Sequence, residues 1–129
     1  MKKVFLFPLF ALFLGITACH KTDTGVYTVA IEFTKPGAEN EVFALNKDMD
    51  IVVKLKRDDN TTIHNVTVDI TNPSNKIANL YTKHESKTGT VTENLTYKPI
   101  ASGSYTITTT TTDGSGAQPN TAKRIFIVK

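Results

Sequence analysis

The sequence has a single cysteine, Cys19, and no tryptophan. One thiol cannot form an internal disulfide, so a disulfide-stapled scaffold and a Cys-x-x-Cys site are both excluded. Catalytic motifs are also missing, because there is no Gly-x-Ser-x-Gly elbow, no P-loop and no His-Glu-x-x-His. We therefore expect no enzyme. The members of a serine triad converge only in space, so a small hydrolase stays open as an alternative.

An excess of charge of one sign is lacking as well. The chain has 15 basic and 12 acidic residues. Cleavage of residues 1–18 as a signal peptide would remove Lys2 and Lys3 and leave the two signs almost balanced. We therefore expect no nucleic acid as a partner, because such binding depends on a strong positive field.

Long hydrophobic runs are confined to the N-terminus. A short basic start, Met1 to Lys3, precedes an uncharged apolar stretch from Val4 to Ile16. Spanning a bilayer of roughly 30 Å takes about 20 apolar residues, so this stretch is too short for a comfortable membrane span. A basic start, a short apolar core and small residues at its exit are typical of a signal peptide.

The exit of this segment, Ile16-Thr17-Ala18-Cys19, resembles the lipobox of bacterial lipoproteins. The resemblance implies cleavage before Cys19 and attachment of two or three fatty acyl chains, such as palmitate, which together give a durable membrane anchor. His20 follows the cysteine where the common inner-membrane retention signal has Asp, which favours the outer membrane of a Gram-negative cell. The alternative is an ordinary secretory signal with a chance cysteine. We thus divide the chain into a signal peptide (1–18), a lipidated cysteine with a tether (19–25) and one domain (26–129).

The domain shows apolar residues with a period of two, which is typical of half-buried strands. The inward residues predict seven or eight short strands separated by turns at 35–37, 57–60, 72–75 and 113–116. Threonine is abundant, with six in residues 106–112, and β-branched residues favour strands. No stretch has a helical period. The members of the expected core faces are Tyr27, Val29, Ile31 and Phe33; Ile51, Val53 and Leu55; Val66, Val68 and Ile70; Val91, Glu93, Leu95 and Tyr97; and Tyr105, Ile107, Thr109 and Thr111.

The segment from Gly103 to Ile107, followed by Asp113-Gly114, resembles the late strands of bacterial immunoglobulin-like and fibronectin-III-like modules. The resemblance implies an all-β, antiparallel immunoglobulin-like sandwich. The chain departs from true immunoglobulin domains because it has no tryptophan and no cysteine pair. The resemblance therefore implies a fold class and no particular function.

Two histidines are the strongest candidate metal ligands. If the 72–75 turn pairs Asn72 with Lys76, then Val68 faces Leu80 and His64 faces His84, at the rim of the core. Two such imidazoles suit Zn²⁺ or Cu²⁺, with Glu85 as a third ligand. The alternative is a structural or exposed pair, since a register slip of one residue would separate the rings.

Two further groups of residues are candidates for binding. Five aspartates fall at expected strand ends, where they could bind calcium or simply stabilise turns: Asp48, Asp50, Asp58, Asp59 and Asp113. Of the four tyrosines, Tyr27, Tyr97 and Tyr105 are expected in the core, while Tyr81 is expected on the outer face. The Asn-x-Thr sequences at Asn60, Asn65 and Asn94 are read as coincidence in a threonine-rich chain.

The function expected from these features is that of a membrane-anchored, surface- or periplasm-exposed lipoprotein with a non-catalytic binding or accessory module. Its partner would be a protein or a glycan. An envelope protein that handles Zn²⁺ or Cu²⁺ and a small lipid-anchored hydrolase are the alternatives.

Overall fold

The computed structural model describes residues 28–57, 62–84, 87–112 and 119–129. These residues form nine strands, and none of them belongs to a helix that could cross a bilayer. The strands are β1 (Ala30–Lys35), β2 (Glu41–Phe43), β3 (Met49–Lys56), β4 (Thr62–Thr71), β5 (Ile77–Lys83), β6 (Lys87–Thr88), β7 (Thr90–Tyr97), β8 (Gly103–Thr112) and β9 (Asn120–Val128).

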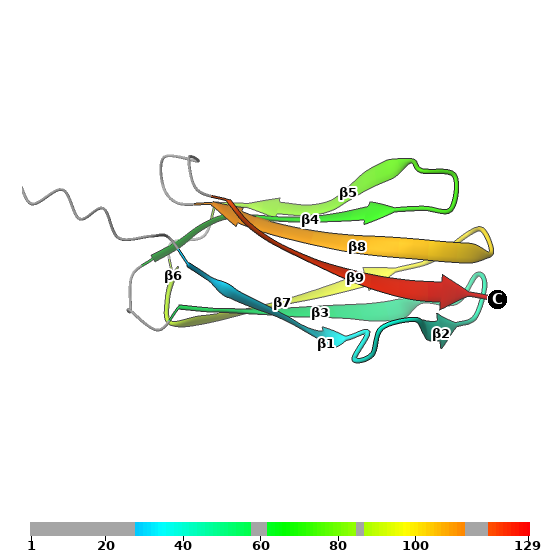
Figure 1. Ribbon diagram of the computed structural model, residues 1–129, viewed down its shortest axis with the longest axis horizontal. Coiled ribbons are helices and arrows are strands. Elements are labelled where there is room, and N and C mark those ends of the chain that lie inside the picture. Colours follow the sequence, from blue (N-terminus) through cyan, green and yellow to red (C-terminus); the bar gives the residue numbers. More distant parts are fainter. Residues whose placement is uncertain (1–27, 58–61, 85–86, 113–118) are drawn as a thin grey trace, which may run out of the picture.

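The strands form two sheets packed face to face along the long axis of the molecule (Figure 1). One sheet has the order β1-β3-β7, and the other has the order β2-β9-β8-β4-β5, with β6 paired to β4. Neighbouring strands run antiparallel except β2 and β9, which run parallel. The predicted all-β antiparallel sandwich is therefore confirmed, whereas the parallel β2–β9 pair and the two-residue strand β6 were not predicted.

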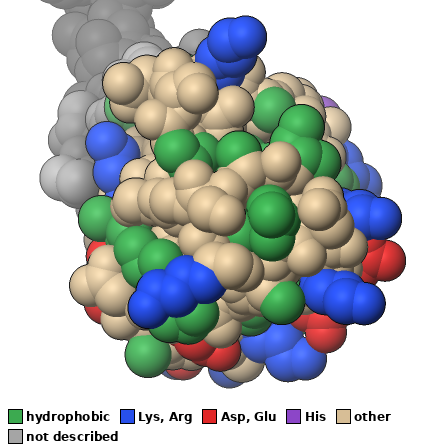
Figure 2. Space-filling model, turned by 90° about the vertical axis from the view of Figure 1, so that its right-hand side faces the viewer, with side chains coloured by type: hydrophobic (Ala, Val, Ile, Leu, Met, Phe, Trp, Pro, Cys, Tyr) green, Lys and Arg blue, Asp and Glu red, His purple; other side chains and the backbone are tan. Residues whose placement is uncertain are grey.

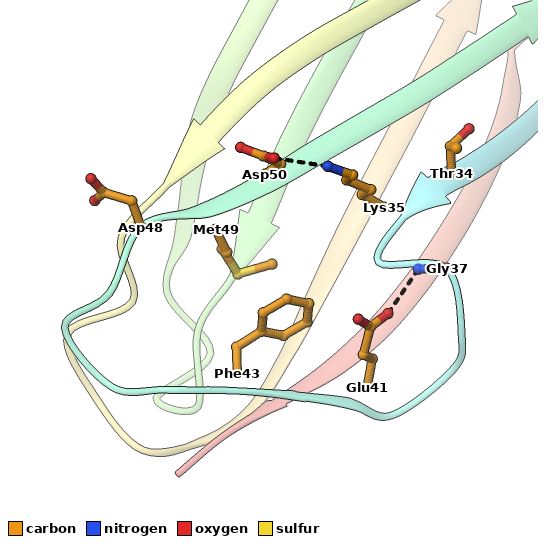
Figure 3. Close-up of a pocket in the computed structure, with 8 residues that line it drawn as sticks. All are labelled: Thr34, Lys35, Gly37, Glu41, Phe43, Asp48, Met49 and Asp50. Carbon is orange, nitrogen blue, oxygen red and sulfur yellow. Dashed lines mark hydrogen bonds and ion pairs between the residues drawn. The ribbon is translucent and has the colours of Figure 1, made fainter.

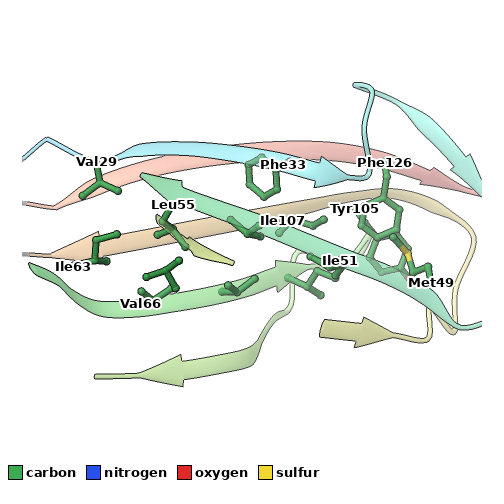
Figure 4. Close-up of a cluster of buried hydrophobic side chains, with 14 of the residues drawn as sticks. Val29, Phe33, Met49, Ile51, Leu55, Ile63, Val66, Tyr105, Ile107 and Phe126 are labelled. Carbon is green, nitrogen blue, oxygen red and sulfur yellow. The ribbon is translucent and has the colours of Figure 1, made fainter. Parts of the chain in front are cut away.

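The core lies between the sheets and follows the predicted alternation (Figure 4). In β3, Ile51, Val53 and Leu55 are completely buried, while the intervening Lys54 and Lys56 are exposed. Burying an aliphatic side chain of this size contributes about 1.5–3 kcal/mol relative to leaving it exposed, so this alternation fixes the face of each strand. Tyr27 lies outside the described residues.

Tyr105 anchors the start of β8. Its ring is fully buried and stacks on Phe126 with the ring centroids 5.1 Å apart. Its hydroxyl donates a hydrogen bond to the carbonyl of Ala101 at 2.9 Å and accepts one from the Ala101 amide at 3.2 Å. The loop before β8 is thereby tied to the core at the position that the sequence resemblance singled out.

The turn between β4 and β5 forms as the sequence predicts. The Asn72 amide donates to the carbonyl of Lys76, and the Asn72 side-chain oxygen accepts from the amides of Ser74 and Lys76. Asn75 has a φ of 61°, a left-handed conformation that asparagine tolerates better than most residues. This turn closes one end of the sandwich.

Candidate functional site

The two ends of the sandwich differ, and the end opposite the entry of the chain carries the candidate binding surface. The described chain enters at the start of β1 at one end, while its C-terminus, Lys129, lies at the other (Figure 1). We call this second end the distal end, and define it by the loops 36–40, 44–48, 72–76 and 98–102 together with Lys129. Hydrogen bonds connect its loops, because the Asn46 amide donates to the Pro99 carbonyl and the Leu45 amide donates to the Lys129 carbonyl.

Three exposed aliphatic side chains distinguish the distal end. Val42 is 55% exposed, Ile77 is 72% exposed and Ile100 is 77% exposed. These are the exposed large hydrophobic side chains among the described residues, and all three belong to distal segments of different strands or loops. Figure 2 views this end and shows apolar side chains between polar ones, with basic and acidic side chains around the edge. Apolar side chains surrounded by polar groups are typical of a protein-binding surface.

Exposed charged side chains lie at the edge of the distal end. They are Lys47, Lys76, Lys98 and Lys129, together with Glu39 and Asp48. Lys35 forms an ion pair with Asp50 at 2.9 Å, and Arg124 forms one with Glu39 at 3.4 Å. The four lysines belong to neither of these pairs.

A pocket of about 500 Å³ opens beside this surface, between the end of β1, β2 and the start of β3 (Figure 3). Phe43 and Met49 supply its apolar wall. Its carboxylates are largely engaged, because Asp50 pairs with Lys35 and Glu41 accepts a hydrogen bond from the Gly37 amide at 2.8 Å.

The eight described residues that line this pocket include no histidine, serine or cysteine. A second hollow of about 250 Å³ lies between the 72–75 turn and β8. Its described lining residues are Thr71, Asn72, Pro73, Asn75, Ser104 and Thr106.

The histidine pair lies near the other end, on the outer face of the larger sheet. The rings of His64 and His84 lie with their centroids 5.4 Å apart and their planes tilted by 39°. His64 pairs with Thr112 in the ladder, and the adjacent Ile63 is completely buried, so His64 points away from the core. The two rings therefore meet as predicted, but on the outer face instead of the core rim.

Two β-bulges explain this difference in position. In the β4–β5 ladder, Val68 pairs with Tyr81 and Asp69 pairs with Asn79, so Leu80 is the extra residue. The predicted pairing of Val68 with Leu80 is therefore wrong, and so is the direct ladder pairing of His64 with His84. The shift turns Tyr81 toward the core, where it is half-buried, so its predicted outer position is also wrong.

The second bulge lies in β4 itself, at Asn65. The β4–β8 ladder passes from His64–Thr112 to Thr67–Thr110, which leaves one extra residue in β4. Asn65 has a φ of 44°, and a non-glycine residue held there costs roughly 1–3 kcal/mol. The Asn65 side-chain oxygen lies 2.8 Å from Nδ1 of His84. Bulges commonly re-aim side chains, and this one directs Asn65 at the histidine pair.

The other candidate metal ligands form no cluster among the described residues. Among the described residues, no group of three or more His, Cys, Asp or Glu side chains is placed to hold a metal ion. Asp48 and Asp50 both line the 500 Å³ pocket, but they belong to no such group. Glu85, Asp58, Asp59 and Asp113 lie outside the described residues, and so do Cys19, His20 and the whole lipobox.

Tyr97 packs edge-on against Tyr105, with the ring centroids 6.0 Å apart. Burial raises the pKa of the Tyr97 hydroxyl above its ordinary value, and the neighbouring Tyr105 hydroxyl adds to this increase. Tyr105 is therefore fully buried and Tyr97 is partly buried against the core, as the sequence predicts.

Comparisons with known proteins give a fold. No protein-family model and no curated protein matches this chain. Among solved structures, the chain resembles the CARDB domain of a Pyrococcus furiosus protein, crystallised in complex with di-metal ions. The identity is 17%, the TM-score is 0.55, and the match covers 79% of this chain and 88% of that one. A solution structure of the same domain matches with 15% identity and a TM-score of 0.56, over 78% of this chain and 93% of that chain.

A third match is part of a larger enzyme. A family 123 glycoside hydrolase from Clostridium perfringens aligns with 12% identity and a TM-score of 0.52, over 80% of this chain but only 27% of the enzyme. At these identities the similarity concerns the fold alone. Together with the two-sheet topology, it shows that this chain has an immunoglobulin-like β-sandwich domain.

Proposed function

We propose that this chain is a lipid-anchored protein of the outer membrane whose immunoglobulin-like domain is a non-catalytic accessory module that binds a protein through its distal end. The observation that carries the proposal is the position of the exposed aliphatic side chains. They lie at the end of the sandwich farthest from the point where the described chain begins (Figure 1). An N-terminal anchor would therefore leave this surface directed away from the membrane.

The chemistry of the distal end favours a protein over a glycan as the partner. Stacking on sugar rings requires exposed aromatic faces, and the exposed large apolar side chains among the described residues are all aliphatic. Isoleucine and valine side chains surrounded by charged groups are complementary to a protein surface that presents apolar side chains beside charged ones. We therefore expect such a partner in the envelope.

The anchor is tested by lipid labelling. Cells grown with a clickable palmitate analogue should label the wild-type chain in the outer-membrane fraction. The Cys19→Ala variant should remain unlabelled, because no thiol is left to accept the lipid. The neighbouring His20→Ala variant is the matched control and should keep its label. Absence of label from the wild-type chain would overturn the anchor.

The binding surface is tested by photo-crosslinking from single positions. A photoreactive residue at Ile100 should give one adduct of discrete mass in intact cells, identified by mass spectrometry. The same residue at Asn94, which is exposed on the outer face of the smaller sheet, should give none. Adding Ile77→Asp should reduce the adduct at position 100 at least tenfold, because a carboxylate is poorly accommodated in an apolar interface.

Two results would contradict this assignment. Equal adducts from positions 100 and 94 would mean that the distal end has no special role. A specific signal on a glycan array that survives Ile77→Asp would assign a carbohydrate partner and another surface.

A further inference from the structure

The histidine pair has features that a chance contact between two surface rings does not require. The full sequence has three histidines, and two of them lie side by side although 20 positions separate them in the chain. Their contact depends on both bulges, which place His64 and His84 on the same outer face. The pair lies far from the distal end and is independent of the surface described above.

Asn65 fixes the tautomer of the neutral His84 ring. An amide oxygen can only accept a hydrogen bond, so Nδ1 of His84 must donate its proton to Oδ1 of Asn65, 2.8 Å away. In the neutral imidazole, Nε2 then carries the lone pair. Histidines that bind metals commonly donate their other ring N–H to an oxygen in this way, which orients the ring and raises its basicity.

The separation of the rings matches a shared ion. With metal–nitrogen bonds of about 2.0 Å, two imidazoles have ring centroids about 4.5 Å apart in neighbouring positions of a square-planar Cu²⁺ site and about 6.3 Å apart in opposite positions. The observed value of 5.4 Å lies between the two.

The number of protein ligands selects the metal. Zinc sites normally use three or four protein ligands, and no third His, Cys, Asp or Glu joins this pair among the described residues. Copper(II) binds nitrogen ligands more tightly than the other divalent ions of the first transition row, and it accepts water in its remaining positions. Two imidazoles are therefore a better match to Cu²⁺.

We propose that His64 and His84 form a surface site for one Cu²⁺ ion, and that Asn65 positions His84 as a ligand. The site goes beyond the proposed accessory function and does not depend on the lipid anchor or on a partner at the distal end.

The test uses the full chain in detergent with Cys19→Ser and His20→Ala, so that no thiol remains and the pair supplies all the imidazoles. Titration with Cu²⁺ should give one equivalent bound, and electron paramagnetic resonance should show coupling to two imidazole nitrogens. His84→Gln, at an exposed position, should weaken binding at least tenfold, and His64→Gln should do the same.

A variant of Asn65 distinguishes a role in positioning the His84 ring from a role in folding. Asn65→Gly removes the acceptor, while glycine accepts the positive φ. This variant should therefore bind Cu²⁺ about 10–100-fold more weakly, as expected for loss of an outer hydrogen bond, without a lower melting temperature. Thr92→Ala, on the other sheet, is the matched control and should leave the affinity unchanged. Binding of less than one equivalent by the parent chain, or equal binding by the His64→Gln/His84→Gln double variant, would overturn the proposal.

Discussion

At the scale of single residues, two threonines in β8 show how position decides the energetic role of a hydroxyl. Thr109 and Thr111 are both completely buried on the inward face of the strand. The Thr111 hydroxyl donates to the carbonyl of His64 at 2.7 Å, so it connects β8 to the strand that carries the histidine pair. Within the described part of the chain, the Thr109 hydroxyl has no hydrogen-bond partner.

Replacing each threonine by valine should therefore have opposite effects. Thr109→Val removes an unsatisfied polar group at nearly constant volume, and should raise the free energy of unfolding by about 1 kcal/mol. Thr111→Val leaves the His64 carbonyl without this donor, and should lower the free energy of unfolding by about 1–2 kcal/mol. Urea denaturation of both variants measures the difference, and a destabilised Thr109→Val would contradict the assignment.

Tyr97 should make stability depend on alkaline pH. Its raised pKa means that the folded protein holds the hydroxyl proton more tightly than the unfolded chain does. This contribution is fully present below the unfolded pKa of about 10 and is lost as the pH rises through the higher folded value. The melting temperature should therefore decline above about pH 10, and Tyr97→Phe should decline less steeply. If the melting temperatures of the wild type and Tyr97→Phe changed identically with pH, Tyr97 would have no part in the alkaline loss of stability.

At the scale of elements, the entry into β8 depends on a close approach of two loops. Gly103 has a φ of 133°, a conformation that side chains rarely adopt. A Cβ atom placed there would lie 2.9 Å from Cβ and Cγ of Pro73, in the turn between β4 and β5. The contact brings that turn against the loop that carries Ile100.

Substitution of Gly103 should destabilise the fold, because of its positive φ and because of its close approach to Pro73. Gly103→Ala should lower the free energy of unfolding by roughly 1–3 kcal/mol, as measured by urea denaturation. Gly37→Ala is the matched control at the same end of the molecule. Its added Cβ would make an ordinary 3.4 Å contact, so a small effect is expected. Equal losses in the two variants would argue against a special role for the Gly103 backbone.

The strands themselves were predictable from the sequence, but the bulges were not. The alternation of Ile51, Val53 and Leu55 follows directly from a period of two, and the turn at Asn72 has its own composition signal. A bulge adds one residue without changing composition, and a shift of one residue exchanges the faces of a strand. This is why the predicted outer position of Tyr81 failed.

The histidine contact was predicted for a reason that was only partly right. The bulges at Asn65 and Leu80 moved both histidines to the outer face together, so the rings still meet. The role of Asn65 was missed altogether. Its one signal in the sequence is that asparagine tolerates a positive φ, which is too weak to locate a bulge. The exposed aliphatic side chains of the distal end were also missed, because exposure depends on how the strands and loops pack.

At the scale of the whole molecule, the two candidate sites lie toward opposite ends of one sandwich (Figure 1). The proposed copper site is near the entry of the chain, and the proposed protein-binding surface is at the distal end. Strands that are hydrogen-bonded along their length separate the two, and no exposed residue is shared between them.

We therefore expect the two sites to act independently. Saturation with Cu²⁺ should leave the yield of the crosslink at position 100 unchanged, and His84→Gln should not affect it either. The measurement is the adduct yield with and without one equivalent of Cu²⁺. A change that disappears in His84→Gln would reveal coupling through the sheets.

The alignment of the strands with the long axis has a mechanical consequence. A tether at one end and a partner held at the other would pull along β1 and its neighbours, while the hydrogen bonds of an antiparallel ladder lie across that direction. Many hydrogen bonds would then share the load in shear, and they would not open one after another. A domain built in this way can bear tension between a membrane surface and the partner that it binds.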